Sequence, residues 1–213
     1  MSETWSSAAR LLPNQPVSRE TWARLEAYAS ELRKWEPAQN LVGPATLNAV
    51  WSRHIADSLQ LLPMIPAHRR IVDIGSGAGF PGLVLAIARG EGGGPVHLVE
   101  SNKRKAAFLR AAARAASTKV DVHADRAESA LSRLAVETSV GTVTARALAP
   151  LVKLLELTEP ATTAGAKCVF PKGQNFQAEI DAANKQWKFD VDIVQSVVAQ
   201  DSVILRLSSI SRR

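Results

Sequence analysis

The sequence has few of the features that mark secreted, membrane-spanning or metal-binding proteins. Its 213 residues include one cysteine, Cys168, so no disulfide can form within the chain. No apolar run approaches the roughly 20 residues that a membrane-spanning helix needs, and no basic and apolar leader precedes the first predicted helix. The four histidines show no metal-ligand spacing. These absences favour a metal-free protein of the reducing cytoplasm.

Aromatic residues are also scarce, at 5% of the chain, and neither sign of charge dominates. The 26 Lys and Arg residues against 20 Asp and Glu leave a formal net charge of +6, spread along the sequence. Such an excess permits a polyanionic partner such as RNA without requiring one. The tryptophans fall mostly in predicted amphipathic helices and favour packing over base stacking. A non-catalytic RNA-binding module is therefore disfavoured.

The most informative stretch is an apolar strand that runs into a glycine-rich turn. The apolar run begins at Ile71, and the turn that follows contains four glycines, Gly75, Gly77, Gly79 and Gly82. Glycine tolerates positive φ and has no Cβ, so backbone amides in such a turn can approach a ligand closely. Pro81 has its φ preset for the first turn of the helix that follows. Strand, turn and helix together predict the nucleotide-binding corner of a doubly wound α/β domain.

Two cofactors fit this turn. Read from Gly77, it matches the dinucleotide fingerprint G-x-G-x-x-G; read from Asp73, it matches D-x-G-x-G-x-G, the pattern of S-adenosylmethionine-dependent methyltransferases. Both predict an acidic residue after the second strand for the ribose hydroxyls, and Glu100 is at the expected distance. Asp73 favours S-adenosylmethionine, because a carboxylate would repel a pyrophosphate and attract the ammonium and sulfonium of the methyl donor. A nicotinamide-dependent oxidoreductase, using NAD or NADP, remains the alternative.

The N-terminal part predicts a helical cap. Residues 1–16 are polar and contain prolines, which predicts a loosely held arm. Apolar residues recur at three- and four-residue steps over 18–35, an amphipathic helix that Pro37 ends or follows. A second helix is expected over 47–62, with Thr46 as its N-cap. We therefore expect an arm and cap over residues 1–66 and a cofactor-binding domain over residues 67–213.

The rest of the chain alternates between strands and helices, which predicts a parallel sheet covered on both faces. Strands are expected near 70–75, 96–100, 120–124, 140–145, 166–170, 190–198 and 202–208. Helices are expected near 81–90, 102–116, 127–135, 148–160 and 175–186. The last two strands are joined too closely for a parallel pair and should form a hairpin. A seven-stranded, mostly parallel sheet with an antiparallel last strand is the class I methyltransferase form of the Rossmann-like fold.

Residues at the strand ends narrow the chemistry. The fourth strand ends in Thr144-Ala145-Arg146, without the motif of enzymes that methylate exocyclic amines. Cys168 lies within an apolar strand, badly placed for the nucleophile that pyrimidine-carbon methylation needs. A purine N7 has a lone pair and no proton, so its methylation needs positioning but no general base. Arg146 and Lys172, at the fourth and fifth strand ends, are the positioning candidates. A small-molecule methyltransferase remains a further alternative.

As a set, these residues resemble one family, bacterial small-subunit ribosomal RNA guanine-N7 methyltransferases, once called glucose-inhibited division protein B. The resemblance is carried by Asn40-Leu41, Arg53-His54-x-x-Asp57-Ser58, the pattern from Asp73 to Gly82, Glu100-Ser101, Arg126-Ala127-Glu128, Arg146-Ala147 and Lys172-Gly173. It extends from about Trp35 to about Gly173. Gln39 departs from it, since the family usually has an aromatic residue there, which affects only the local loop.

The resemblance implies methylation of N7 of one guanine in 16S rRNA, with S-adenosylmethionine as cofactor and rRNA or the small ribosomal subunit as partner. The cofactor contacts it implies are Gly75, Phe80, Ala127, Glu128 and Arg146, with Glu100 as the acidic residue at the second strand end. Arg53, His54 and Lys172 are implied for contact with RNA or guanine. We expect a monomer that binds no membrane.

Overall fold

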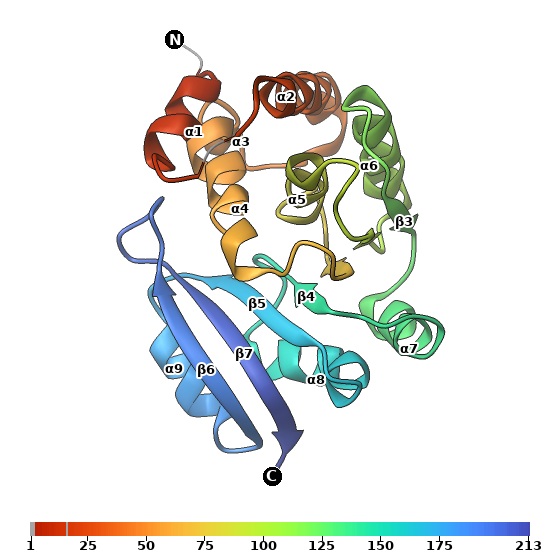
Figure 1. Ribbon diagram of the computed structural model, residues 1–213, viewed down its shortest axis with the longest axis vertical. Helices are drawn as coiled ribbons and strands as arrows, with labels where there is room; N and C mark the ends of the chain where they lie inside the picture. Colours follow the sequence, from red (N-terminus) through yellow and green to blue (C-terminus); the bar gives the residue numbers. More distant parts are fainter. Residues whose placement is uncertain (1–2, 16) are drawn as a thin grey trace.

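The computed structural model describes residues 3–15 and 17–213, with the backbone alone at 44 and 45. Its centre is a seven-stranded sheet in the order β3-β2-β1-β4-β5-β7-β6 (Figure 1). The strands are β1 Ile71–Ile74, β2 Val96–Val99, β3 Asp121–His123, β4 Thr142–Thr144, β5 Lys167–Lys172, β6 Trp187–Gln195 and β7 Val203–Arg212. The strands from β3 to β5 pair in parallel, as predicted.

The last strand, β7, is antiparallel to both of its neighbours, β5 and β6. The prediction of a hairpin is confirmed, and with it the class I methyltransferase form of the fold. The boundaries differ from the expected ones: β6 begins at Trp187 and ends at Gln195, and β7 continues to Arg212. The serines at 208, 209 and 211 conceal the end of β7 from a reading by hydrophobicity.

Helices cover both faces of the sheet. They are α1 Trp5–Leu11, α2 Arg19–Gln39, α3 Pro44–Leu47, the π-helix Trp51–Ala56, α4 Asp57–Leu59, the 3₁₀ turn Leu62–Met64, α5 Gly82–Arg89, α6 Lys103–Ala115, α7 Ala127–Glu137, α8 Leu151–Thr163 and α9 Phe176–Ala183. No helix within the described ranges has the length and apolarity to cross a membrane.

The buried apolar residues form two hydrophobic clusters, and successive side chains of the central strand β1 contribute to different clusters. Ile71 belongs to a cluster with the N-terminal helices, α5 and α6. Val72 and Ile74 belong to the other cluster, with α7, α8 and α9. Because side chains alternate across a strand, Asp73 must face the same side as Ile71, toward α5.

The expectation of a loosely held arm is wrong for the described residues 3–15. Ala8 on α1 is fully buried, and the Trp5 ring lies 5.7 Å from that of Trp22 on α2. The Glu3 carboxylate accepts hydrogen bonds from the Ser52 amide (2.9 Å) and hydroxyl (2.6 Å). These contacts join the segment to helices distant in sequence, which local composition does not reveal. Met1, Ser2 and Pro16 lie outside the described residues.

The two predicted cap helices also differ in detail. Pro37 does not end α2, which continues to Gln39 and stops where Asn40 adopts a left-handed conformation with φ 45°. The second helix is not continuous: it divides into α3, the π-helix and α4. Thr46 lies inside α3, where its hydroxyl donates to the Gly43 carbonyl, so it is not the N-cap. π-Helical turns occur often at functional sites, and this one carries Arg53 and His54.

Candidate functional site

The glycine turn follows β1 at the carboxyl edge of the sheet, where α/β folds bind their ligands. Gly75, Gly77 and Gly79 have φ of 66°, 55° and 98°, values that other residues rarely adopt. A Cβ at Gly75 would lie 2.7 Å from the Leu148 side chain, whereas a Cβ at Gly77 would meet only the Gly75 carbonyl oxygen, at 3.8 Å. The turn therefore presents bare backbone toward open space at Gly77.

Glu100 connects the end of β2 to this turn. One carboxylate oxygen, Oε2, accepts from the Gly77 amide (2.9 Å), and the other accepts from the Asn102 amide (2.8 Å). Only 8% of the residue is exposed. The strand pairing of β1 with β2 thus brings together the two features that the sequence places more than twenty residues apart.

The Asp73 carboxylate, which the sequence assigns to the methyl donor, is engaged by groups of the protein itself. It is fully buried, and its two carboxylate oxygens accept from the Thr144 hydroxyl (2.8 Å) and the Gly82 amide (3.2 Å). Burial raises the pKa of Asp73 to about 6, against hydrogen bonds that lower it. Asp73 therefore joins β1, β4 and the start of α5.

Arg146, just beyond β4, makes the largest set of contacts at this edge. Its Nη1 donates to Asp57 Oδ2 (3.1 Å) and to the Arg53 carbonyl (3.3 Å), and its Nη2 donates to His54 Nδ1 (2.8 Å). Its guanidinium also lies 5.0 Å from the centre of the Phe80 ring. One side chain thus ties the glycine turn and β4 to the π-helix and α4.

These contacts determine the protonation of His54. A guanidinium can only donate, so Nδ1 accepts and the proton resides on Nε2, which donates to the Thr46 hydroxyl (3.0 Å). Burial first, then the charges of Arg146 and Arg53, lower the pKa of His54 to about 4. The imidazole is therefore neutral at physiological pH, and both of its nitrogens are occupied by protein contacts.

Phe80 belongs to an aromatic group beneath the turn. Its ring stacks on His54, with 4.8 Å between centroids, and meets the edge of Tyr28 at 5.6 Å. Tyr28 is fully buried and donates its hydroxyl to the Ala78 carbonyl (2.6 Å), and burial raises its pKa well above the ordinary value. The 4% exposure of Phe80 makes it chiefly a support for the turn.

Two hollows flank the segment after β4. The β1–β3 hollow, about 160 Å³, is lined by Gly75, Leu148 and Leu157, by Val99 and Ser101, and by the loop from Asp125 to Glu128. The β4–β5 hollow, about 450 Å³, is lined by Asp57, Gln60, residues 146–150, residues 171–173, Glu179 and residues from the β6–β7 hairpin. The structure thus places Ala127 and Glu128 in one hollow with Gly75, and Lys172 in the other with Arg146.

Lys172 is more constrained than the sequence suggests. Its side chain is 9% exposed, and its Nζ donates to Glu179 Oε2 (2.7 Å) and to the Ala149 carbonyl (2.9 Å). Glu179 Oε2 also accepts from the Leu151 amide at the start of α8 (2.6 Å). Arg53, by contrast, is exposed, and its carbonyl is the group that contacts Arg146.

Four residues of this edge were not predicted as site residues: Tyr28, Gln60, Leu148 and Glu179. Gln60 is buried and bonds both Asp57 Oδ1 (2.8 Å) and the Val197 amide (3.0 Å), which ties α4 to the hairpin. Leu148 is 40% exposed and lines both hollows. None of these four residues belongs to a sequence motif. The only hint in the sequence concerns Leu148, an apolar residue two positions after Arg146 at a strand end.

Comparison with known proteins supplies the family. Residues 21–207 match the family described as rRNA small subunit methyltransferase G. A protein of that name from Methylorubrum populi is 47% identical over 205 residues, covering 96% of each chain. One from Rhizobium meliloti is 44% identical over 212 residues, covering 98% of each.

Solved structures share the fold at low sequence identity. An O-methyltransferase from Streptomyces achromogenes, in complex with SAM, aligns with a TM-score of 0.60 at 16% identity, covering 98% of this chain and 99% of that one. An O-methyltransferase from Bacillus cereus, in complex with SAH, aligns with a TM-score of 0.59 at 14% identity, covering 96% and 97%. The sheet order and the sequence relatives agree: this chain belongs to the rRNA small subunit methyltransferase G family.

Proposed function

We propose that the protein transfers a methyl group from S-adenosylmethionine to N7 of a guanine in small-subunit 16S rRNA. The observation that carries the proposal is the open glycine turn held by Glu100, at the same carboxyl edge of the sheet as the two hollows, in a chain that matches the family over residues 21–207. One hollow suits the cofactor and the other suits the acceptor base.

The cofactor fits the residues around the turn. The Gly77 position leaves space where a side chain would project, and Glu100 is placed to accept from ribose hydroxyls if its bond to Gly77 opens. Ala127 and Glu128 line the β1–β3 hollow, which we assign to the adenine. When bound, S-adenosylmethionine supplies an electrophilic methyl group. Asp73, Phe80 and Arg146 then act by holding the turn in shape.

The acceptor is assigned to the β4–β5 hollow. Its charged lining groups are already engaged: Asp57 with Arg146 and Gln60, and Lys172 with Glu179. His54, next to Arg146, is neutral and has no free lone pair. Within the described residues, the charged groups of this hollow can therefore position an acceptor, but their existing contacts leave them poorly suited to remove a proton from it. Guanine N7 needs no proton removed, so it is the acceptor that such an edge can serve.

Cys168 does not favour pyrimidine-carbon chemistry. The thiol is fully buried in β5, its Sγ lies 3.8 Å from the Thr158 hydroxyl, and burial raises its pKa to about 12. A thiolate nucleophile is unavailable under such conditions. The family match likewise favours a methyl donor over a dinucleotide.

The partner in this proposal is 16S rRNA, free or within the small ribosomal subunit, and the enzyme acts as a cytoplasmic monomer. Arg53, exposed on the π-helix, and Lys172 are the side chains that we assign to RNA contact.

The test compares rRNA from cells with and without the gene. N7-methylguanine is mapped by strand scission, and we expect one guanine in the small-subunit rRNA to lose its mark when the gene is deleted. A plasmid copy should restore the mark, and a copy carrying Gly77→Asp should not. An identical pattern of N7-methylguanine in both strains would contradict the proposal.

A further inference from the structure

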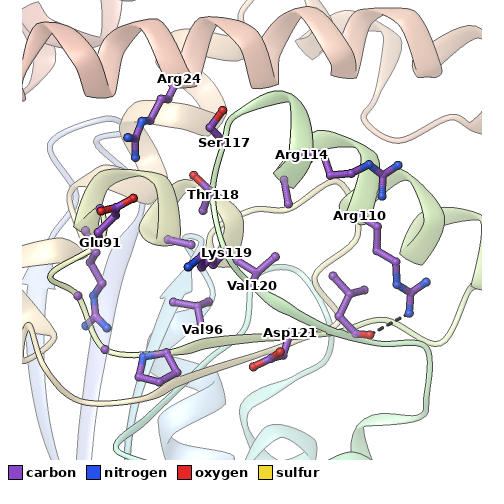
Figure 2. A pocket seen from close by; sticks show the side chains of 18 of the residues that line it. Arg24, Glu91, Val96, Arg110, Arg114, Ser117, Thr118, Lys119, Val120 and Asp121 are labelled. Atoms are coloured by element: carbon purple, nitrogen blue, oxygen red, sulfur yellow. Dashed lines mark hydrogen bonds between the residues drawn. The ribbon is translucent and has the colours of Figure 1, made fainter.

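A groove much larger than either hollow lies at the opposite edge of the sheet. Its volume is about 1100 Å³, and it is formed by α2, the connection from α5 to β2, the C-terminal half of α6 and the connection from α6 to β3 (Figure 2). Val96 and Asp121, at the amino ends of β2 and β3, line its base. We call it the amino-edge groove. It is separate from the glycine turn, which lies at the carboxyl ends of the strands.

The groove concentrates positive charge. Five cationic side chains line it, Arg24, Arg89, Arg110, Arg114 and Lys119. Two carboxylates, Glu91 and Asp121, also line the groove. Burial lowers the pKa of His123, which favours its neutral form. The excess of three positive charges equals half of the formal net charge of the whole chain, +6.

The cations divide into those that build the groove and those that are available to a ligand. Arg89 is half-buried and donates to the carbonyls of Arg69 (2.8 Å) and Pro66 (2.9 Å), so it holds the groove wall. Arg24 pairs with Glu20 at 2.6 Å, and Arg110 donates to the Val122 carbonyl (2.9 Å). Arg114 and Lys119 are exposed, and neither forms a hydrogen bond or ion pair with the described part of the chain. Figure 2 shows Lys119 below Ser117 and Thr118, and Arg114 on the other side of the view, near Arg110.

The uncharged lining indicates which part of a polyanion the groove can hold. It consists largely of small aliphatic side chains, including Ala86, Ala113, Val96 and Val120, and of glycines. His123 has the one aromatic ring among the lining residues, and it is hydrogen-bonded to His97 (2.9 Å). Nucleobases would therefore find no stacking platform, whereas phosphates need only cations and hydroxyl donors.

We propose that the amino-edge groove binds the phosphodiester backbone of a second segment of the substrate RNA, remote from the methylated guanine. This proposal rests on the proposed function, because it takes rRNA as the polyanion. The RNA is held at two opposite edges of the sheet, so a short fragment around the target guanine reaches only the carboxyl edge. Arg114 and Lys119 supply the phosphate contacts.

The experiment measures equilibrium binding of full-length small-subunit rRNA and of a short stem-loop around the target guanine. The variant is Arg114→Ala with Lys119→Ala. Its matched control is Lys185→Ala with Lys188→Ala, which removes the same charge from two exposed lysines near the other end of the chain. Each phosphate contact contributes about 0.7–0.9 to the slope of log affinity against log salt. Two lost contacts therefore reduce the slope by about 1.5, so the wild type loses about eightfold more affinity than the variant between about 50 and 200 mM salt.

We expect this reduced slope for full-length rRNA only, with the short stem-loop and the control unaffected. Arg114→Lys with Lys119→Arg should bind like the wild type, and thermal unfolding checks that each variant folds. An unchanged slope with full-length rRNA would overturn the proposal, and so would an equal loss on the stem-loop. Methylation of the same rRNA by the wild type, free and within small ribosomal subunits, is measured in parallel. If either is methylated while the slope is unchanged, the second RNA site fails and the proposed function stands; if neither is methylated, both fail.

Discussion

The buried carboxylate of Asp73 leads to a prediction about pH and stability. Its pKa is raised from 3.8 to about 6, chiefly by burial, so the folded state holds this proton more tightly than the unfolded chain. Its ionisation therefore costs stability as the pH rises from about 4 through about 6. One pKa unit corresponds to about 1.4 kcal/mol, so the full cost is about 3 kcal/mol at neutral pH.

Asp73→Asn removes the cost of ionising a buried carboxylate, while hydrogen bonds to Gly82 and Thr144 can still form. The asparagine oxygen can accept from the Gly82 amide, and its amide group can donate to the Thr144 hydroxyl. Between about pH 4.5 and about pH 7.5, the free energy of unfolding of the variant should therefore rise by about 2 kcal/mol relative to the wild type. The assay is urea unfolding at a series of pH values. A difference between the two proteins that does not change with pH would refute the reasoning.

The same variant separates the two roles considered for Asp73. If the residue holds the turn from below, as the contacts indicate, Asp73→Asn should bind S-adenosylmethionine within a few-fold of the wild type, measured by calorimetry at neutral pH. If its charge grips the methyl donor directly, affinity should fall by more than about tenfold, since charged hydrogen bonds contribute about 1.5–3 kcal/mol. A loss of that size in a folded variant would contradict the geometry.

Gly77→Asp should abolish S-adenosylmethionine binding in calorimetry, because it adds a carboxylate beside Glu100 at a backbone φ of 55°; wild-type affinity would refute the placement. Arg146→Lys keeps the charge but loses the fork that bonds Asp57 and His54, so we expect about 1–3 kcal/mol less stability and slower methylation; unchanged urea unfolding would contradict this. Lys172→Ala should weaken RNA turnover more than cofactor binding, and the opposite result would assign Lys172 to the cofactor.

The fold was largely predictable because its signals are local. The alternation of apolar runs, the glycines after β1 and the short connection before Val203 depend on neighbouring residues alone. They predicted a parallel sheet with an antiparallel last strand, and the structure confirms it. The N-terminal arm was not predictable in this way, because Ala8 and Trp5 are ordered by contacts with residues far along the chain.

The candidate site shows the same limit. In the sequence, Asp57 belongs to one short motif with Arg53 and His54, but the structure pairs it with Arg146, 89 residues away. The direction of Asp73 follows from strand alternation, since Ile71 faces the same side. Its two bonding partners, however, come from β4 and α5, and only the tertiary structure brings them together.

The most direct test of the account replaces a single atom of the acceptor. Purified protein, methyl-labelled S-adenosylmethionine and small-subunit rRNA are incubated, once with the natural target guanine and once with 7-deazaguanine at that position. We expect label in N7-methylguanosine with the natural RNA and none with the 7-deaza RNA, which binds but has a carbon in place of the reacting nitrogen. Equal labelling of the two RNAs would contradict methylation at N7.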